Sequence, residues 1–317
     1  MYYYSKKIIA EDPIANAQAR IDKPEVNCWH SLTESECISN ELTDASLDLL
    51  KPLLTSKPQT GIFCVGSTQA FYAAAWGNPS FVLLMDRNSK VIRSSLLYKS
   101  LLINLANVVE VQRFKPYYEA NNSAIFDDLR NALWTKLSPE EKKLFLTNPR
   151  KKYKNKEPDL TNNITDEEIR NLYQNYSLTL AQPDTYLTDQ TKLDRLFKLF
   201  ADQRFVIVHQ NILSASAEQL MRKYAAEQKQ FSFIYVSNIL DGDWLRKEET
   251  ILFDRFIGSM PKCPTASLIA SYDSSATERK AIETSGLDHI SSTSTSWTYT
   301  IKPLPNTVQP QPYIRDH

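Results

Sequence analysis

The sequence predicts an α/β fold: a doubly wound, Rossmann-like and mostly parallel sheet with an inserted helical block. Three observations predict it. Apolar runs of strand length alternate with amphipathic runs of helical length on both sides of a helix-rich middle. The strand runs are continuously apolar, as expected for parallel strands that are covered on both faces. Several of these runs end in polar residues, and open α/β sheets bind ligands at the carboxyl ends of their strands.

Two parts are expected along the chain. Residues 1–58 should form a polar, proline-interrupted N-terminal extension with short helices, one of them at 46–54. Residues 59–317 should form the α/β domain, whose helical block occupies about 115–200. Before the block, the domain is expected to contain a strand at 60–66, a helix at 67–76, a strand at 80–86, a helix at 89–106 and a strand at 107–114.

The helical block has one clear helix start and one long polar run. Thr165 and Glu168 form the pattern of a capping box, and the lysine-rich run at 148–163 is typical of a solvated loop. After the block the α/β alternation returns. The expected elements are a strand at 204–210, a helix at 214–228, a strand at 231–239, a helix at 247–260, a strand at 265–272, a short helix at 279–287 and an edge strand at 294–304.

Composition excludes several classes of protein. Lys+Arg and Asp+Glu both number 37, so the basic excess of a general nucleic-acid or membrane-surface binder is missing. No window reaches the roughly 18 apolar residues of a membrane span, and the N-terminus lacks the apolar core of a signal peptide. The four cysteines have no CxxC spacing, which favours reduced thiols. These features predict a cytoplasmic protein, although export without an N-terminal signal would leave no mark here.

The turn after the first strand is the first candidate site. The chain has only 6 glycines, so Gly66 is expected to mark a backbone position that needs conformational freedom. A glycine there lets Val65, Gly66 and Ser67 approach a ligand, and the helix that begins with Gln69 offers free N–H groups. The turn is neither a P-loop nor GxGxxG, so a plain structural turn is the alternative.

Asp86 ends the second strand, about 20 residues after the first turn, where nucleoside-binding folds hold ribose hydroxyls. The alternative is an ordinary surface aspartate beside Arg87.

Polar residues also follow two later strands. His209 and Asn211 follow one, and Ser237 and Asn238 end the other, so all four should face the same crevice. A lone histidine is more often a packed, hydrogen-bonded residue than a general base. No GxSxG and no metal-ligand spacing is present, so no catalytic residue and no metal site is predicted.

Five segments, at 37–46, 61–76, 81–102, 185–212 and 233–244, resemble in order those of an uncharacterised bacterial family. Its members are similar in fold to class I S-adenosylmethionine-dependent methyltransferases. The matching residues are Ser39, Asn40, Glu41, Gly66, Gln69, Phe71, Asp86, Tyr98, Lys99, Tyr235, Ser237 and Asn238.

The resemblance implies S-adenosylmethionine as the cofactor and methyl transfer to an unknown small-molecule or protein acceptor. The cofactor would be held by Val65, Gly66, Ser67, Gln69, Asp86 and Arg87. The acceptor pocket would be shaped by Asn40, Glu41, His209, Asn211, Ser237 and Asn238.

The chain also departs from that family's pattern. His209 and Gln210 stand where the family has Gly-Asp in the loop after its fourth strand, and Arg87 is the one arginine of a usual pair. These changes imply either a different substrate or a silent site. The alternative function is therefore a catalytically silent Rossmann-like interaction module, for which a secreted bacterial effector is one setting. An NAD-linked oxidoreductase is a third hypothesis, weakened by the missing GxGxxG.

Overall fold

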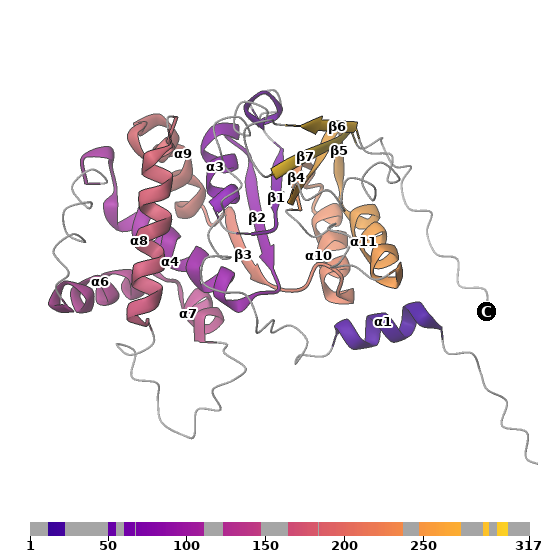
Figure 1. The fold of residues 1–317 in the computed structure, drawn as a ribbon, viewed down its shortest axis with the longest axis horizontal. Helices are drawn as coiled ribbons and strands as arrows, with labels where there is room; N and C mark the ends of the chain where they lie inside the picture. The colour runs from indigo at the N-terminus through magenta and orange to yellow at the C-terminus, as the bar shows by residue number, and fades with distance from the viewer. Residues whose placement is uncertain are drawn as a thin grey trace, which may run out of the picture.

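A seven-stranded sheet with helices on both faces forms the centre of the molecule (Figure 1). This computed structural model describes residues 12–22, 50–54, 60–66, 68–110, 123–146, 164–182, 184–236, 247–273, 288–291 and 297–303. Among these residues lie β1 (Gly61–Cys64), β2 (Phe81–Asp86), β3 (Phe205–His209), β4 (Phe231–Tyr235), β5 (Lys262–Asp273), β6 (Asp288–Ser291) and β7 (Trp297–Pro303).

The strand order is β3-β2-β1-β4-β5-β7-β6. The first five strands are parallel, whereas β7 runs antiparallel to both β5 and β6. The chain builds outward from β1 to β3 and then returns to place β4 on the other side of β1. This reversal creates the topological switch point at which doubly wound sheets bind ligands. The predicted fold class is confirmed.

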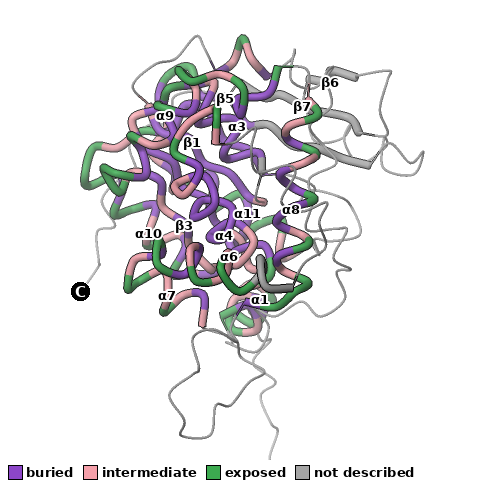
Figure 2. Tube along the Cα trace, turned by 90° about the vertical axis from the view of Figure 1, so that its left-hand side faces the viewer, coloured by how far each residue is buried: buried purple, intermediate pink, exposed green. Residues whose placement is uncertain are grey.

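The sheet separates two apolar cores because successive side chains of a strand point to opposite faces. In β1, Ile62 and Cys64 enter one core, and Phe63 enters the other. The first core lies under α3 (Thr68–Gly77), α4 (Ser89–Leu105) and α9 (Gln190–Ala201). The second core lies under α10 (Ala215–Ala226), α11 (Lys247–Ser259) and α1 (Pro13–Ile21). Figure 2 shows the buried chain running through the middle of the molecule.

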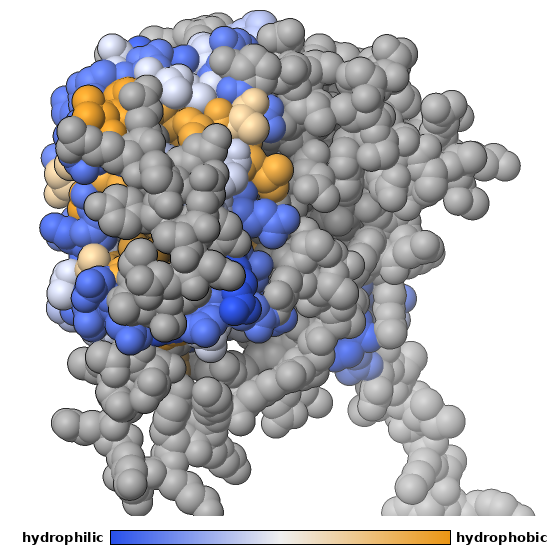
Figure 3. Space-filling view, turned by 60° about the vertical axis from the view of Figure 1, so that its left-hand side comes forward, coloured by the Kyte–Doolittle hydropathy of each residue, from blue (hydrophilic) through white to orange (hydrophobic). Residues whose placement is uncertain are grey.

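The helical block lies between α4 and β3 along the chain. It contains α6 (Ser123–Lys136), α7 (Pro139–Leu146), α8 (Asp166–Ala181), the 3₁₀ helix η4 (Tyr186–Thr188) and α9. Among the described residues, two ion pairs join α4 to the block, Arg93–Glu168 at 2.5 Å and Lys99–Glu141 at 2.6 Å. The predicted capping box at Thr165 is present at the start of α8. On the described part of this side of the molecule, hydrophobic side chains form patches among hydrophilic ones (Figure 3).

Two expected strands differ from the structure. The strand expected at 107–114 is wrong where it can be seen, because 108–110 is a helical turn with Val109 53% exposed. The strand at 205–209 is consequently the third strand along the chain rather than the fourth. It lies at the edge of the sheet and pairs with β2. The C-terminal strand β7 lies inside the sheet, with the unanticipated β6 outside it. The lysine-rich run and the helix expected at 279–287 lie outside the described residues.

Candidate functional site

The carboxyl ends of β1, β2 and β3 bring three of the predicted site residues together. Gly66 follows β1, Asp86 ends β2, and His209 ends β3. Asp86 and His209 are register partners of the parallel β2–β3 pair. The predicted convergence of Gly66 and Asp86 is therefore present, and His209 is closer to Asp86 than its expected place in a fourth strand implied.

Gly66 has the left-handed conformation that its turn requires, with φ of +96°. A β-carbon added there would lie 3.2 Å from Oε1 of Gln69 and would strain the backbone. The turn is fixed on the sheet side, because Val65 N–H donates to the Tyr235 carbonyl at 2.9 Å. Both Val65 and Gln69 are buried. The glycine therefore allows a close approach between the turn and the first residues of α3.

The carboxylate of Asp86 joins the turn after β1 to the turn after β2. Its Oδ2 accepts a hydrogen bond from Gly66 N–H at 3.2 Å, and its Oδ1 accepts one from Asn88 N–H at 2.7 Å. Burial raises the pKa of this carboxyl above its usual value, although the two hydrogen bonds and the charges of Arg87 and His209 partly offset the rise. A carboxylate has about four acceptor positions, so two bonds leave it able to accept more.

Asn88 is a site residue that the sequence reasoning missed. It is 4% exposed, and its Oδ1 caps α4 by accepting from Lys90 N–H at 3.0 Å. Its Nδ2 is buried and has no hydrogen-bond partner among the described residues. A buried donor of this kind is costly unless another group satisfies it. An Asn directly before an amphipathic helix is an N-cap signal, but that signal says nothing about the amide nitrogen.

His209 and Asn211 are both engaged with the chain itself. The Nε2 of His209 lies 3.0 Å from the Arg87 carbonyl oxygen, which can only accept, so Nε2 carries the proton. Asn211 is buried, and its Oδ1 accepts from Leu213 N–H at 3.0 Å within the β3–α10 turn. These contacts hold the two turns beside Asp86 in place.

Arg87 lies between two acidic residues. Burial lowers the pKa of its guanidinium, whereas the charges of Asp86 and Glu249 act in the opposite direction. Glu249, in the first turn of α11, also forms an ion pair with Arg20 at 2.5 Å. Charges from β2, α11 and α1 are thus coupled at this edge of the sheet.

The other predicted site residues, Asn40, Glu41, Ser67, Ser237 and Asn238, lie outside the described residues. Cys64 is buried in the first core, and burial raises the pKa of its thiol, as expected for an apolar filler. Within the described ranges no group of His, Cys, Asp and Glu side chains could hold a metal ion. Among the described helices, none combines the length and the apolar character needed to cross a bilayer.

A groove of about 360 Å³ lies at the opposite, amino end of the strands. Its lining includes Thr60, Ser80, Phe81, Gln203, Gln228 and Gln230. The Phe81 ring stacks on Tyr224 with ring centroids 5.5 Å apart, over a glycine (Gly61) whose β-carbon would collide with the ring. The predicted site residues that the structure describes lie at the other edge.

No curated protein matches the chain. A family model described as a domain of unknown function, DUF7790, matches residues 37–309, a range that contains all seven strands and the helical block. The family's description carries no activity, cofactor or substrate. On this match, the chain belongs to the DUF7790 family.

Proposed function

We propose that the protein binds S-adenosylmethionine at the carboxyl edge of its sheet and transfers the methyl group to an acceptor. The observation that carries the proposal is the Asp86 carboxylate bonded to Gly66 N–H across the ends of β1 and β2. An acidic residue at the end of the second strand, beside a glycine turn, is the arrangement with which nucleoside-binding folds hold a ribose.

The residues at this edge suit an adenosine cofactor. Asp86 keeps acceptor capacity for ribose hydroxyls, and the buried Nδ2 of Asn88 is a donor that a ligand oxygen or ring nitrogen could satisfy. Gly66 keeps a β-carbon out of the approach to Val65 and Gln69. Val65, Gly66, Gln69, Asp86 and Asn88 would therefore hold the cofactor, with Arg87 next to the Asp86 carboxylate that binds the ribose.

The cofactor, when bound, supplies a methyl group that is already activated by its sulfonium. The protein then has to position the acceptor and exclude water, and little acid–base chemistry is required of its side chains. Asp86 would orient the ribose, and the His209–Arg87 contact would keep the β2 turn in place.

The strand order supports the proposal at the level of fold analogy. The strand order reverses beside β1, which is the switch point at which doubly wound folds bind nucleotide-containing ligands. Such an analogy bears on fold and cofactor class, and it says nothing about the acceptor.

A catalytically silent interaction module is the second candidate, and one observation favours it. Both carboxylate oxygens of Asp86 already accept bonds from the chain's own amides, and the Asp86 carbonyl accepts from Gln210 N–H at 2.8 Å. An edge that is bonded to itself in this way can be stable without a ligand.

Calorimetric titration of the unmutated protein with S-adenosylmethionine, S-adenosylhomocysteine and NAD separates the candidates. We expect binding of the two sulfur compounds and not of NAD. Asn88→Ser, which keeps a capping oxygen but removes the amide donor, should weaken binding by about 0.5–1.5 kcal/mol, the scale of one neutral hydrogen bond. If no adenosine compound binds at millimolar concentration, the enzyme proposal is wrong and the silent module is favoured.

A further inference from the structure

The N-terminal helix α1 packs beside the ends of α10 and α11 that lie at the carboxyl edge of the sheet (Figure 1). Its buried residues, Ala17 and Ile21, belong to the same apolar core as Val65 of the glycine turn and Leu213 of the β3–α10 turn. The α1 helix has only 9 residues, and an isolated helix of that length is not stable in water. Its helical state therefore depends on this contact.

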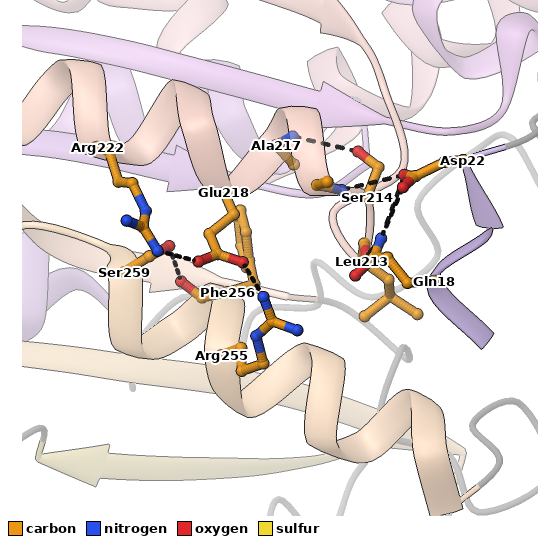
Figure 4. Close-up of polar contacts among 11 residues, drawn as sticks. Gln18, Asp22, Leu213, Ser214, Ala217, Glu218, Arg222, Arg255, Phe256 and Ser259 are labelled. Carbon is orange, nitrogen blue, oxygen red and sulfur yellow. Dashed lines mark hydrogen bonds and ion pairs between the residues drawn. The ribbon is translucent and has the colours of Figure 1, made fainter. Parts of the chain in front are cut away.

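Two side chains, Gln18 within α1 and Asp22 at its C-terminal cap, tie the helix to the start of α10 (Figure 4). Gln18 Nε2 donates to the Leu213 carbonyl at 3.1 Å, and Asp22 Oδ1 accepts from Ala215 N–H at 3.1 Å. The Asp22 carboxylate thus occupies the N-terminus of α10, where the helix dipole favours a negative charge. Leu213 is also the residue whose N–H bonds to Asn211 in the turn after β3.

A third link connects α1 to the charges of the candidate site. Arg20 pairs with Glu249 at 2.5 Å, and Glu249 interacts electrostatically with Arg87, the neighbour of Asp86. The sequence of charges from Arg20 through Glu249 and Arg87 to Asp86 alternates in sign. Release of Arg20 would leave Glu249 without this partner and change the field that acts on Arg87.

We propose that α1 is a docked strap that positions the cofactor site, with Arg20 and Asp22 as positioning residues. The strap holds the β3–α10 turn through Asp22 and Gln18, and its Arg20 neutralises the negative charge of Glu249. This inference rests on the proposed function insofar as it concerns cofactor affinity. When α1 is released, the site-competent fraction falls, and the apparent affinity falls with it.

The test uses three full-length variants. Arg20→Glu places a negative charge against Glu249 and should release α1. Arg20→Lys keeps the charge and should restore docking. Arg222→Glu is the matched control, because Arg222 pairs with Glu218 on the exposed side of α10, and Glu218 keeps its second partner Arg255 (Figure 4). Thermal unfolding establishes that all three remain folded.

Amide hydrogen exchange and S-adenosylhomocysteine titration are the two readouts. For Arg20→Glu we expect roughly tenfold faster exchange within α1, faster exchange at the Gly66 and Asn88 amides, and about three- to tenfold weaker binding. Arg20→Lys and Arg222→Glu should stay close to the parent in both readouts.

Two results would contradict the proposal that α1 positions the cofactor site. One is release of α1 with unchanged exchange at Gly66 and Asn88, and the other is weaker binding while α1 stays protected. If the parent binds no adenosine compound, the proposed function fails, and the strap is then decided by the exchange at Gly66 and Asn88 alone.

Discussion

The two edges of the sheet carry polar residues in different ways. At the amino edge, α9 and α10 end in matching sequences, Ala201-Asp202-Gln203-Arg204 and Ala226-Glu227-Gln228-Lys229. In each, the acidic residue pairs with the basic residue two positions later, in both cases at 2.7 Å. At the carboxyl edge, by contrast, the Asp86 carboxylate reaches from β2 to the turn after β1.

The difference separates charges that complete a helix end from a charge that is available to a ligand. The amino-edge ion pairs neutralise themselves within one turn of chain and are partly exposed, so they contribute little beyond local stability. The carboxyl-edge carboxylate of the half-buried Asp86 is held between elements, and its partial removal from water raises its pKa. Perturbed groups at the switch point of a sheet are the better candidates for function.

The largest effect on this comparison is expected from Gly66→Val. A β-branched residue at φ of +96° would strain the turn and push against Gln69, so cofactor binding should be abolished while stability falls by no more than a few kcal/mol. Gly258→Ala in α11 is the control, because its β-carbon would meet nothing within 4 Å. Titration and thermal unfolding measure both effects; a folded Gly66→Val protein that binds normally would remove the turn from the site.

Asp86→Ala should weaken S-adenosylhomocysteine binding by about 1.5–3 kcal/mol, the scale of a charge-assisted hydrogen bond to a ribose hydroxyl. Asp202→Ala removes a carboxylate at the amino edge that pairs locally, with Arg204, and it should leave the affinity unchanged. Calorimetry on the two variants compares the edges directly. Equal affinity in the parent and the folded Asp86→Ala protein would show that the ribose assignment is wrong.

The raised pKa of Asp86 predicts a pH dependence of stability. A carboxyl whose pKa is higher in the folded than in the unfolded state binds more protons when folded, so its contribution to stability falls as pH rises from the unfolded pKa through the raised one. Asp86→Asn should remove this loss. We expect the stability of the variant relative to the parent to increase with pH above about 4, the ordinary aspartate value. A difference that is flat or opposite in sign in denaturant unfolding would contradict a raised pKa for Asp86.

The smallest expected effect is a gain in stability at the amino edge. Gln203 and Gln228 both have φ of 56°, a left-handed conformation that glycine adopts without strain. Gln203→Gly and Gln228→Gly should each stabilise the protein by about 0.5–1 kcal/mol in urea unfolding, with no change in cofactor affinity. A loss of stability, or a loss of binding, would mean that the glutamine side chains do more than end two helices.

The sequence predicts the sheet well where apolar runs are long. The runs at 61–64, 81–86 and 231–235 are strands, because nearly continuous burial on both faces leaves little choice of structure. The run at 107–114 was wrongly predicted as a strand, because so short an apolar stretch does not distinguish the helical from the strand periodicity. The order of the strands then shifted by one, and with it the place of His209.

The candidate site was predicted in part. Gly66 and Asp86 follow from spacing along the chain, since a strand, a turn, a helix and a second strand fix where they meet. Glu249 and Arg20 could not be predicted, because their roles depend on contacts between β2, α11 and α1 that no local pattern records. The capping role of Asn88 has a local signal, but the burial of its amide nitrogen has none.

The placement of the helical block has a consequence for how the chain folds. Val82 of β2 pairs with Phe205 of β3, and the whole block lies between them in sequence. The edge strand can join the sheet only after that long loop has closed, which is slow compared with pairing across a single crossover helix. Folding of the block onto α4 shortens the search, since it brings α9, and with it β3, back to the sheet. The Asp86–His209 pair would therefore be among the last contacts to form, and the candidate site would mature late in folding.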